Sequence, residues 1–165
     1  MNEVQLTVAD SAAMHRLGAA LAQLCEAGDV VVLTGELGAG KTTLTRGFGE
    51  ALDVRGTVAS PTFVIARTHP ALGDGPALIH VDAYRLSSAL ELDDLDLDLD
   101  ASITVIEWGA EMVSALTDSW LEVLIERPTG TPAAADELEQ PRLVTVRAVG
   151  GRWQPVQLAG LSAAL

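Results

Sequence analysis

The chain is poor in basic residues, and above all in lysine. Its 165 residues include 23 acidic side chains against 10 of lysine or arginine, which gives a net charge of −13. A protein that binds nucleic acid by itself normally needs a basic face that displaces phosphate counterions, and the scattered arginines form no such patch. Any action on nucleic acid is therefore expected to pass through another protein that carries the positive surface.

Cysteine and long apolar runs are also scarce. Cys25 is the only cysteine, so no disulfide can form within the chain, and its apolar helical surroundings predict a buried structural thiol. No apolar run approaches the ~18 residues of a membrane-spanning helix. The first residues, Met1-Asn2-Glu3, lack the basic and then apolar layout of a secretory signal. These absences predict a cytoplasmic protein with no membrane association.

The only lysine, Lys41, stands in the sequence Gly35-Glu36-Leu37-Gly38-Ala39-Gly40-Lys41-Thr42. This spacing is that of the P-loop, the phosphate-binding loop of nucleoside triphosphatases. A β-branched apolar run over 30–34 precedes the loop, and a helical pattern over 42–52 follows it. The glycines allow backbone N–H groups to surround a phosphate, and the helix N-terminus adds partial positive charge. The sequence thus predicts a site for a nucleoside triphosphate with Mg²⁺.

The residues of this loop have separate expected tasks. Lys41 is a compact point charge that suits the β- and γ-phosphates, whereas the planar fork of an arginine has the wrong shape. The hydroxyl of Thr42 is expected on Mg²⁺, and that of Thr43 at the α-phosphate. The rest of the expected nucleotide-binding set is Glu36, Leu37, Gly38, Ala39 and Gly40.

Two acidic residues end predicted apolar strands. Asp82 is the last residue of the run 77–82, and Glu107 is the last residue of the run 102–107. Ligands of parallel sheets bind at these strand ends. Asp82 has the position of a Walker-B-type acid, although it could instead cap a following helix. Glu107 could ligate Mg²⁺ or orient the attacking water, and the division of roles stays open. The predicted catalytic set is Lys41, Asp82 and Glu107, and the predicted metal ligands are Thr42, Glu107 and Asp82.

Two further residues are candidates for nucleotide contacts. Thr62 lies in Ser60-Pro61-Thr62-Phe63, after the P-loop helix, where nucleotide switches place a threonine that senses the γ-phosphate. An ordinary turn is the alternative there. Trp108 can stack on the nucleotide or simply pack. His80 shares a strand face with Asp82 and is more typical of a structural residue.

The acidic stretch 91–100 does not fit a calcium site. An EF-hand loop counted from Asp94 would need glycine at its sixth position, where this chain has Leu99. The leucines of the stretch fit one face of a helix instead. We therefore expect a solvated acidic surface helix, which could also dock a basic partner.

The alternation of strands and helical patterns predicts an α/β fold. It is expected to be a P-loop NTPase-like three-layer sandwich with a largely parallel central sheet and added antiparallel strands. One ATPase domain over 1–155 and a poorly ordered C-terminal tail over 156–165 are expected. The expected strands are 4–8, 30–34, 77–82 and 102–107, with an antiparallel hairpin or edge pair over 121–127 and 142–147, and the expected main helices are 11–26 and 42–52.

Four motifs occur in order: L-G-A-G-K-T-T over 37–43, S-P-T-F over 60–63, H-V-D-A-Y-R over 80–85 and Glu107-Trp108. Together they closely resemble the bacterial TsaE family, also called YjeE. This family comprises the small P-loop ATPases of the machinery that makes threonylcarbamoyladenosine in tRNA. The resemblance covers about residues 3 to 127, and the four motifs together are far more specific than a P-loop alone.

The resemblance implies a protein that binds and hydrolyses ATP with Mg²⁺ but does not itself transfer the threonylcarbamoyl group. Its implied partners are the transferase subunit and the paralogous partner of that subunit, with tRNA reached only indirectly. By motif, Thr42 and Glu107 look like the Mg²⁺ ligands, and Asp82 looks like the Walker-B-type acid. Thr62 lies in the switch-like loop, and Trp108 would stand near the nucleotide.

Other classes compete with this interpretation. A small-molecule P-loop kinase would need an acceptor site and usually an arginine-rich lid, for which Arg67 and Arg85 are candidates although no arginine cluster appears. A GTP switch would need an N-K-x-D motif, and none can exist here because the only lysine, Lys41, belongs to the P-loop. An assembly factor that merely holds ATP stays open. Because no arginine finger is evident, hydrolysis by the isolated protein is expected to be slow.

Overall fold

The computed structural model describes residues 2–36, 38–56, 66–86, 90, 91, 95, 97–127, 141–153 and 158–165. Its strands are β1 (Asn2–Val8), β2 (Val30–Gly35), β3 (Ala66–His69), β4 (Ala77–Asp82), β5 (Ser102–Glu107), β6 (Trp120–Glu126) and β7 (Arg142–Val149). Its helices are α1 (Ser11–Leu24) and α2 (Lys41–Ala51), with 3-10 helices η1 (Ala83–Arg85), η2 (Val113–Ala115), η4 (Gly151–Trp153) and η5 (Leu158–Ala164).

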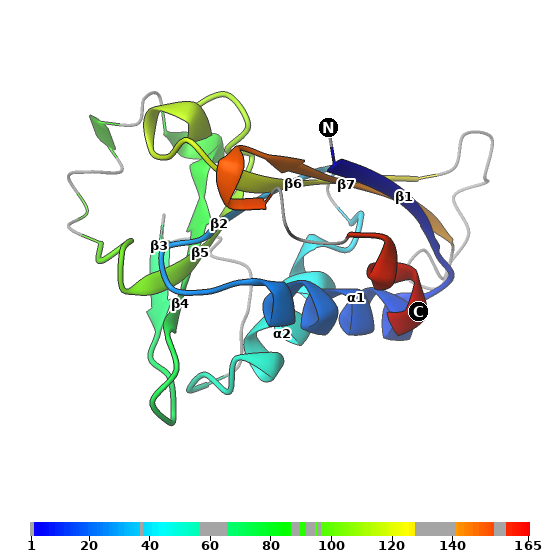
Figure 1. Ribbon diagram of the computed structural model, residues 1–165, viewed down its shortest axis with the longest axis horizontal. Helices are drawn as coiled ribbons and strands as arrows, with labels where there is room; N and C mark the ends of the chain where they lie inside the picture. Colours follow the sequence, from blue (N-terminus) through cyan, green and yellow to red (C-terminus); the bar gives the residue numbers. More distant parts are fainter. Residues whose placement is uncertain are drawn as a thin grey trace.

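The seven strands form one sheet in the order β1-β7-β6-β2-β5-β4-β3 (Figure 1). The four strands β4, β5, β2 and β6 run parallel in its centre. Antiparallel strands extend it on both sides, β3 beside β4 and the pair β7 and β1 beside β6. This confirms the predicted fold class. Because the central strands are parallel, their carboxyl ends meet at one edge of the sheet, which is where ligands of such sheets bind.

The burial of the strands explains why these runs pair as they do. All six residues of β5 are buried, as a central parallel strand covered on both faces requires. Strands β6 and β7 instead alternate between inward and outward residues and pair antiparallel, as predicted for 121–127 and 142–147. They are not an edge pair, because β2 flanks β6 and β1 flanks β7.

The sheet lies between two layers. Helices α1 and α2 cover one face and share with it the larger part of the core, which includes Leu17, Leu44 and Phe48 (Figure 1). The other face is covered by η1, by residues 97–99 and by the segment around η2. All three segments pack on Val32, Ile79 and Ile106. None of the helices within the described ranges has both the length and the apolar character that a bilayer span requires.

The two main helices begin where local chemistry allows. The side chain of Asp10 accepts a hydrogen bond from the backbone N–H of Ala13 at 2.9 Å and so caps α1. The helix ends at Leu24, slightly before the predicted end at residue 26. Helix α2 has no side-chain cap and begins directly after Gly40, whose φ of 117° lies in the left-handed region. The N-terminus of α2 therefore emerges straight from the P-loop.

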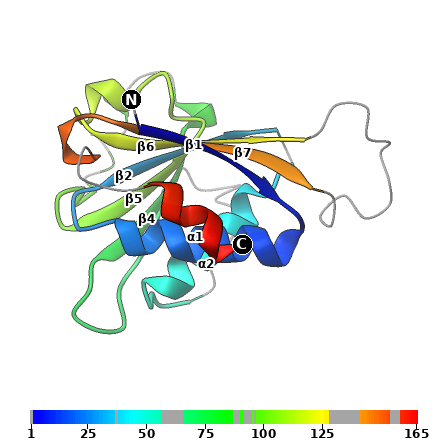
Figure 2. The same cartoon turned by 45° about the vertical axis from the view of Figure 1, so that its right-hand side comes forward.

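The C-terminal residues 158–164 pack against α1 and β1 as η5 (Figure 2). Leu158 and Leu161 are buried there, and the guanidinium of Arg16 donates to the carbonyl of Ala164 at 3.2 Å. The division of the chain into 1–155 and 156–165 stays a prediction. What the structure adds is that this described part of the tail closes the helical side of the core.

Cys25 lies at the C-terminus of α1 and packs partly buried against the core. Burial raises the pKa of its thiol well above the ordinary value, and the nearby carboxylate of Asp29 adds to this rise. A thiol with a raised pKa forms little thiolate and is a poor nucleophile. Its surroundings therefore agree with the structural role expected from the sequence.

Two glycines allow α1 and α2 to approach each other closely. A Cβ atom on Gly18 of α1 would lie 1.9 Å from the carbonyl oxygen of Leu44, and a Cβ on Gly47 of α2 would lie 1.9 Å from that of His15. Both obstacles are backbone atoms, so no side-chain rotation can relieve the clash. The contact therefore fixes the position of α2, and with it that of the P-loop.

We predict that Gly18→Ala and Gly47→Ala each lower the free energy of unfolding by about 1–3 kcal/mol, because the added methyl must separate the helices. This loss would exceed the gain of up to about 1 kcal/mol that alanine brings to a helix interior. Gly160→Ala in η5 is the matched control, since a Cβ there meets nothing within 4 Å. Urea unfolding followed by circular dichroism measures the effect, and wild-type stability in both helix variants would contradict the close contact.

Candidate functional site

The P-loop connects β2 to α2 at the carboxyl edge of the sheet. Gly38 and Gly40 both have positive φ angles, 79° and 117°, which non-glycine residues rarely adopt. Ala39 lies between them and is buried. Leu37, one of the predicted nucleotide contacts, lies outside the described residues. The glycine spacing of the motif thus matches a tight backbone turn that leads into the N-terminus of a helix.

The side chain of Lys41 folds back onto the first residues of this loop. Its side chain is only 8% exposed, and the ammonium donates to the carbonyls of Gly35 and Glu36. The Nζ atom also lies 4.4 Å from the centre of the Trp108 ring, within the range of a cation–π interaction. Burial lowers the pKa of Lys41, while the carboxylates of Glu107 and Asp82 act in the opposite direction. All three predicted catalytic residues therefore lie close enough to interact.

Glu107 ends β5 and is 5% exposed. Its Oε2 atom lies 2.9 Å from Nε2 of His80, which is fully buried on β4. Because an ionised carboxylate can only accept, Nε2 of His80 is the donor of this hydrogen bond when Glu107 is ionised. The bond occupies one oxygen of Glu107 and limits the rotation of its side chain. His80, predicted as a structural residue, directly contacts a predicted catalytic acid.

Asp82 ends β4 in direct register with Glu107 on β5. Its Oδ1 atom accepts a hydrogen bond from the backbone N–H of Tyr84 at 3.1 Å. The capping role considered as an alternative is therefore present, in a 3-10 helix. It does not remove Asp82 from the site, because its charge still acts on Lys41. Two carboxylates on neighbouring strand ends thus lie near enough to the lysine of the loop for their charges to act on it.

This donor set fits Mg²⁺ better than a metal held by protein alone. No group of three or more His, Cys, Asp or Glu side chains that could hold a metal ion occurs among the residues the structure describes. Mg²⁺ typically takes one or two carboxylates together with water and substrate phosphates. Glu107, Asp82 and the hydroxyl of Thr42, which follows Lys41 at the start of α2, are oxygen donors of that kind.

Trp108 has a backbone conformation that is unusual for its size. Its φ of 63° is a strained value for a bulky residue, and its N–H donates to the carbonyl of Leu33 on β2 at 3.0 Å. This turn directs the indole toward the loop, where it is 39% exposed. Tyr84 meets the ring edge-on at 6.0 Å. Two exposed aromatic rings therefore border the site, one of them against Lys41.

A cleft of about 380 Å³ opens beside the loop. That volume is within the range of small-molecule sites. The cleft lies between the P-loop and the end of β6, and Trp108 forms part of its wall. Its lining residues are Thr34, Gly35, Glu36, Ala39, Trp108, Leu124, Ile125, Glu126 and Arg127.

Arg142 also reaches the loop and was not predicted from the sequence. It is 4% exposed, and its Nε atom donates to the carbonyl of Ala39 at 3.2 Å. The sequence signal that would have found Arg142 is the side of the strand on which it falls in the alternating pattern of β7. On β7 it points to the same side as Val144 and Val146, where an arginine is unusual because that side is buried.

Two predicted features are described only in part or not at all. Thr62 and the rest of Ser60–Phe63 lie outside the described residues, so its proposed sensing role stays a prediction. Of the acidic stretch, residues 97–100 form no helix but lead through a turn into β5. Leu97 and Leu99 pack against the face of the sheet that α1 and α2 do not cover. The predicted acidic surface helix is therefore wrong for this part, because these leucines are held by the core rather than by a helix face.

The chain is similar to known proteins over most of its length. Residues 8–133 match the family model of the threonylcarbamoyl adenosine biosynthesis protein TsaE. A relative from Streptomyces coelicolor, named tRNA threonylcarbamoyladenosine biosynthesis protein TsaE, is 55% identical over 90% of this chain and 99% of its own. A relative of the same name from Bacillus subtilis is 37% identical over 88% of this chain and 84% of its own.

The structure agrees with this assignment. The crystal structure of YdiB from Bacillus subtilis superimposes on the chain with a TM-score of 0.71 and 26% sequence identity, covering 98% of this chain and 95% of that one. The family model extends over well more than half of the residues and includes the P-loop and both acidic strand ends. The protein belongs to the TsaE family.

Proposed function

We propose that this protein binds ATP with Mg²⁺ at the P-loop and hydrolyses it in support of the threonylcarbamoyladenosine modification of tRNA. It would act on the transferase complex rather than transfer the group itself. The observation that carries the proposal is the placement of the P-loop lysine and of two acidic strand ends, Asp82 and Glu107 in register on β4 and β5, at one edge of the sheet. The relatives are named for the biosynthesis of this modification, which supplies the biological setting.

In this proposal the loop grips the phosphate chain. Backbone N–H groups of the loop and the N-terminus of α2 supply fixed positive charge, and Lys41 pairs with the β- and γ-phosphates. Bound Mg²⁺ would neutralise the charge that develops on the phosphates, with Thr42, Glu107 and Asp82 as its protein ligands. Asp82 and Glu107 are also the acids available to orient the attacking water. Catalysis would thus consist mainly of positioning and electrostatic stabilisation.

The remaining contacts are assigned by position. Trp108 would border the nucleotide, because its ring already lies against Lys41. Thr62 would sense the γ-phosphate, and Glu36 and Leu37 would complete the loop contacts. The net charge of −13 favours contact with tRNA through partners, namely the transferase subunit and its paralogue. Such a role would place the protein in the cytoplasm.

One alternative has an observation in its favour. The cleft beside the P-loop could hold an acceptor, as a small-molecule kinase requires, and Arg127 is part of its lining. The two functions differ in the fate of the γ-phosphate. Release of inorganic phosphate that rises with the transferase complex supports the ATPase, whereas transfer to a small acceptor without that complex supports a kinase.

We predict that Lys41→Ala weakens the affinity for ATP–Mg²⁺ about 10- to 100-fold, the effect expected for loss of charge-assisted hydrogen bonds to phosphate. The matched control is Arg46→Ala, which removes an exposed cation from the same helix. Isothermal titration of both variants with ATP–Mg²⁺ measures the difference, and phosphate release with and without the transferase complex gives the activity. Equal ATP affinity in Lys41→Ala and wild type would show that the P-loop is not the ATP-binding site.

His80 gives a second prediction, because it holds the proposed metal ligand Glu107. His80→Leu removes the donor to Oε2, and we expect the Mg²⁺ concentration for half-maximal ATP hydrolysis to rise about 10- to 100-fold. His80→Gln keeps a side-chain donor and should restore part of the loss.

The control is His69→Leu, which removes a buried imidazole of β3 whose Nδ1 lies 3.4 Å from the carbonyl of Arg55 instead. Melting temperatures of all three variants establish that they are folded. A rise of equal size in His69→Leu, or none in His80→Leu, would show that the His80–Glu107 bond does not serve the metal.

A further inference from the structure

A buried arginine joins β7 to the P-loop. Arg142 is the first residue of β7, and its Nε atom donates to the carbonyl of Ala39 at 3.2 Å. Its Nη2 atom lies 3.4 Å from the carbonyl of Gly38. The two ends of this contact are 103 residues apart, and only the strand order β7-β6-β2 brings them together. The guanidinium therefore links two parts of the fold that share no local sequence.

The position would ordinarily be filled by an apolar residue. Arg142 shares its side of β7 with Val144 and Val146, which belong to the main core. Burial of a charged group is costly unless hydrogen bonds compensate for it, and a well-packed hydrophobic residue often gives equal or greater stability. A contribution to stability is therefore a weak explanation for an arginine at this position. Its contacts with carbonyls of the P-loop suggest instead a role in phosphate binding.

The geometry of the peptide unit shows what that task can be. The C=O and N–H groups of one peptide plane point in opposite directions. By holding the carbonyls of Gly38 and Ala39, Arg142 sets the directions of the N–H groups of Ala39 and Gly40. The N–H of Ala39 donates to the carbonyl of Glu36 at 3.0 Å. Arg142 thus controls above all the Gly40 N–H, immediately before Lys41.

The loop needs such a constraint because of its composition. Gly38 and Gly40 have many accessible backbone conformations, and fixing them when a ligand binds costs entropy. A guanidinium that fixes these peptides beforehand reduces that cost. Its charge also polarises the two carbonyls, which strengthens hydrogen bonds made by the N–H groups of the same peptides.

We propose that Arg142 is a positioning residue that pre-organises the P-loop for the phosphate chain of the nucleotide. This inference rests on the proposed function. It predicts that Arg142 strengthens the binding of any ligand with a chain of phosphates, including inorganic tripolyphosphate. A ligand without such a chain, such as AMP, gains little from the pre-organised loop.

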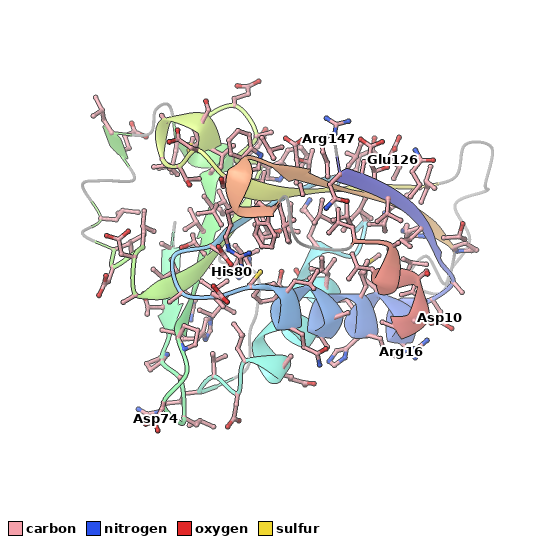
Figure 3. All side chains as sticks on the ribbon, viewed as in Figure 1. Asp10, Arg16, Asp74, His80, Glu126 and Arg147 are labelled. Carbon is pink, nitrogen blue, oxygen red and sulfur yellow. The ribbon has the colours of Figure 1, made fainter. Side chains whose placement is uncertain are left out.

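The test compares Arg142→Met and Arg142→Lys with the same substitutions at Arg147. Arg147 lies on β7 but points to the opposite face, where it pairs with Glu3 at 2.8 Å (Figure 3). Affinities for ATP–Mg²⁺ and for tripolyphosphate are measured by isothermal titration, and that for AMP by competition. We expect Arg142→Met to weaken ATP and tripolyphosphate about 10- to 100-fold, with AMP changed less than about twofold. Arg142→Lys should be intermediate, and both Arg147 variants should match the wild type.

A second measurement separates positioning from a merely structural role. Addition of guanidinium ion at millimolar concentration should restore part of the tripolyphosphate affinity of Arg142→Ala but none of that of Lys41→Ala. Amide hydrogen exchange of residues 38–41 without nucleotide should be faster in Arg142→Lys than in the wild type. These readouts follow the loop itself and not the global stability of the fold.

The outcomes distinguish this inference from the proposed function. If wild type and Arg147→Met fail to bind ATP and tripolyphosphate, the proposed function is overturned and the inference with it. If wild type binds but Arg142→Met binds equally well, only the inference is overturned. Equal losses for AMP and ATP would also overturn it, because Arg142 would then serve the nucleoside. Should Arg142→Met not fold, wild-type affinity in Arg142→Lys is the result that overturns it.

Discussion

The site depends on one buried ammonium group. Lys41 lies almost out of solvent, and its charge is compensated by the carbonyls of Gly35 and Glu36, by the Trp108 ring and by two carboxylates. An uncompensated charge at this position would be strongly unfavourable. These partners come from the ends of β2, β4 and β5, whereas Lys41 itself begins α2. The ammonium is therefore stable only where the sheet and the helix are already assembled, which ties the chemistry of the site to the fold.

The fold supplies that assembly through two constraints. The parallel order β4-β5-β2 brings Asp82 and Glu107 to the same edge as the P-loop. The close contact of α1 with α2, made possible by Gly18 and Gly47, fixes the helix from which Lys41 projects. Neither constraint is sufficient alone, since the first places the acids and the second places the lysine.

The sequence predicted the part of the site that local patterns encode. Strong apolar runs located β2, β4 and β5, and their terminal acids could be placed together because parallel strands share a carboxyl edge. The hydrogen bond between His80 and Glu107 was beyond reach, since strand phase gives the face but not the partner. Arg142 was missed because pairing across the sheet, and not local sequence, brings it to the loop. For residues 97–100 the predicted helix was wrong for a related reason, because Leu97 and Leu99 pack on the core rather than along a helix face.

The charges around the loop also explain why phosphate and Mg²⁺ belong together in the proposed site. Lys41 and Arg142 place two cations at the loop, and Asp82 and Glu107 place two carboxylates beside it. A phosphate chain that entered without a metal ion would meet those carboxylates directly, at a depth where solvent screens charge poorly. A divalent ion between the phosphates and the acids would turn that repulsion into attraction on both sides. In the proposed site the acids would then favour the metal-bound nucleotide over the free one, so the same residues would provide both binding and selectivity for the reactive form.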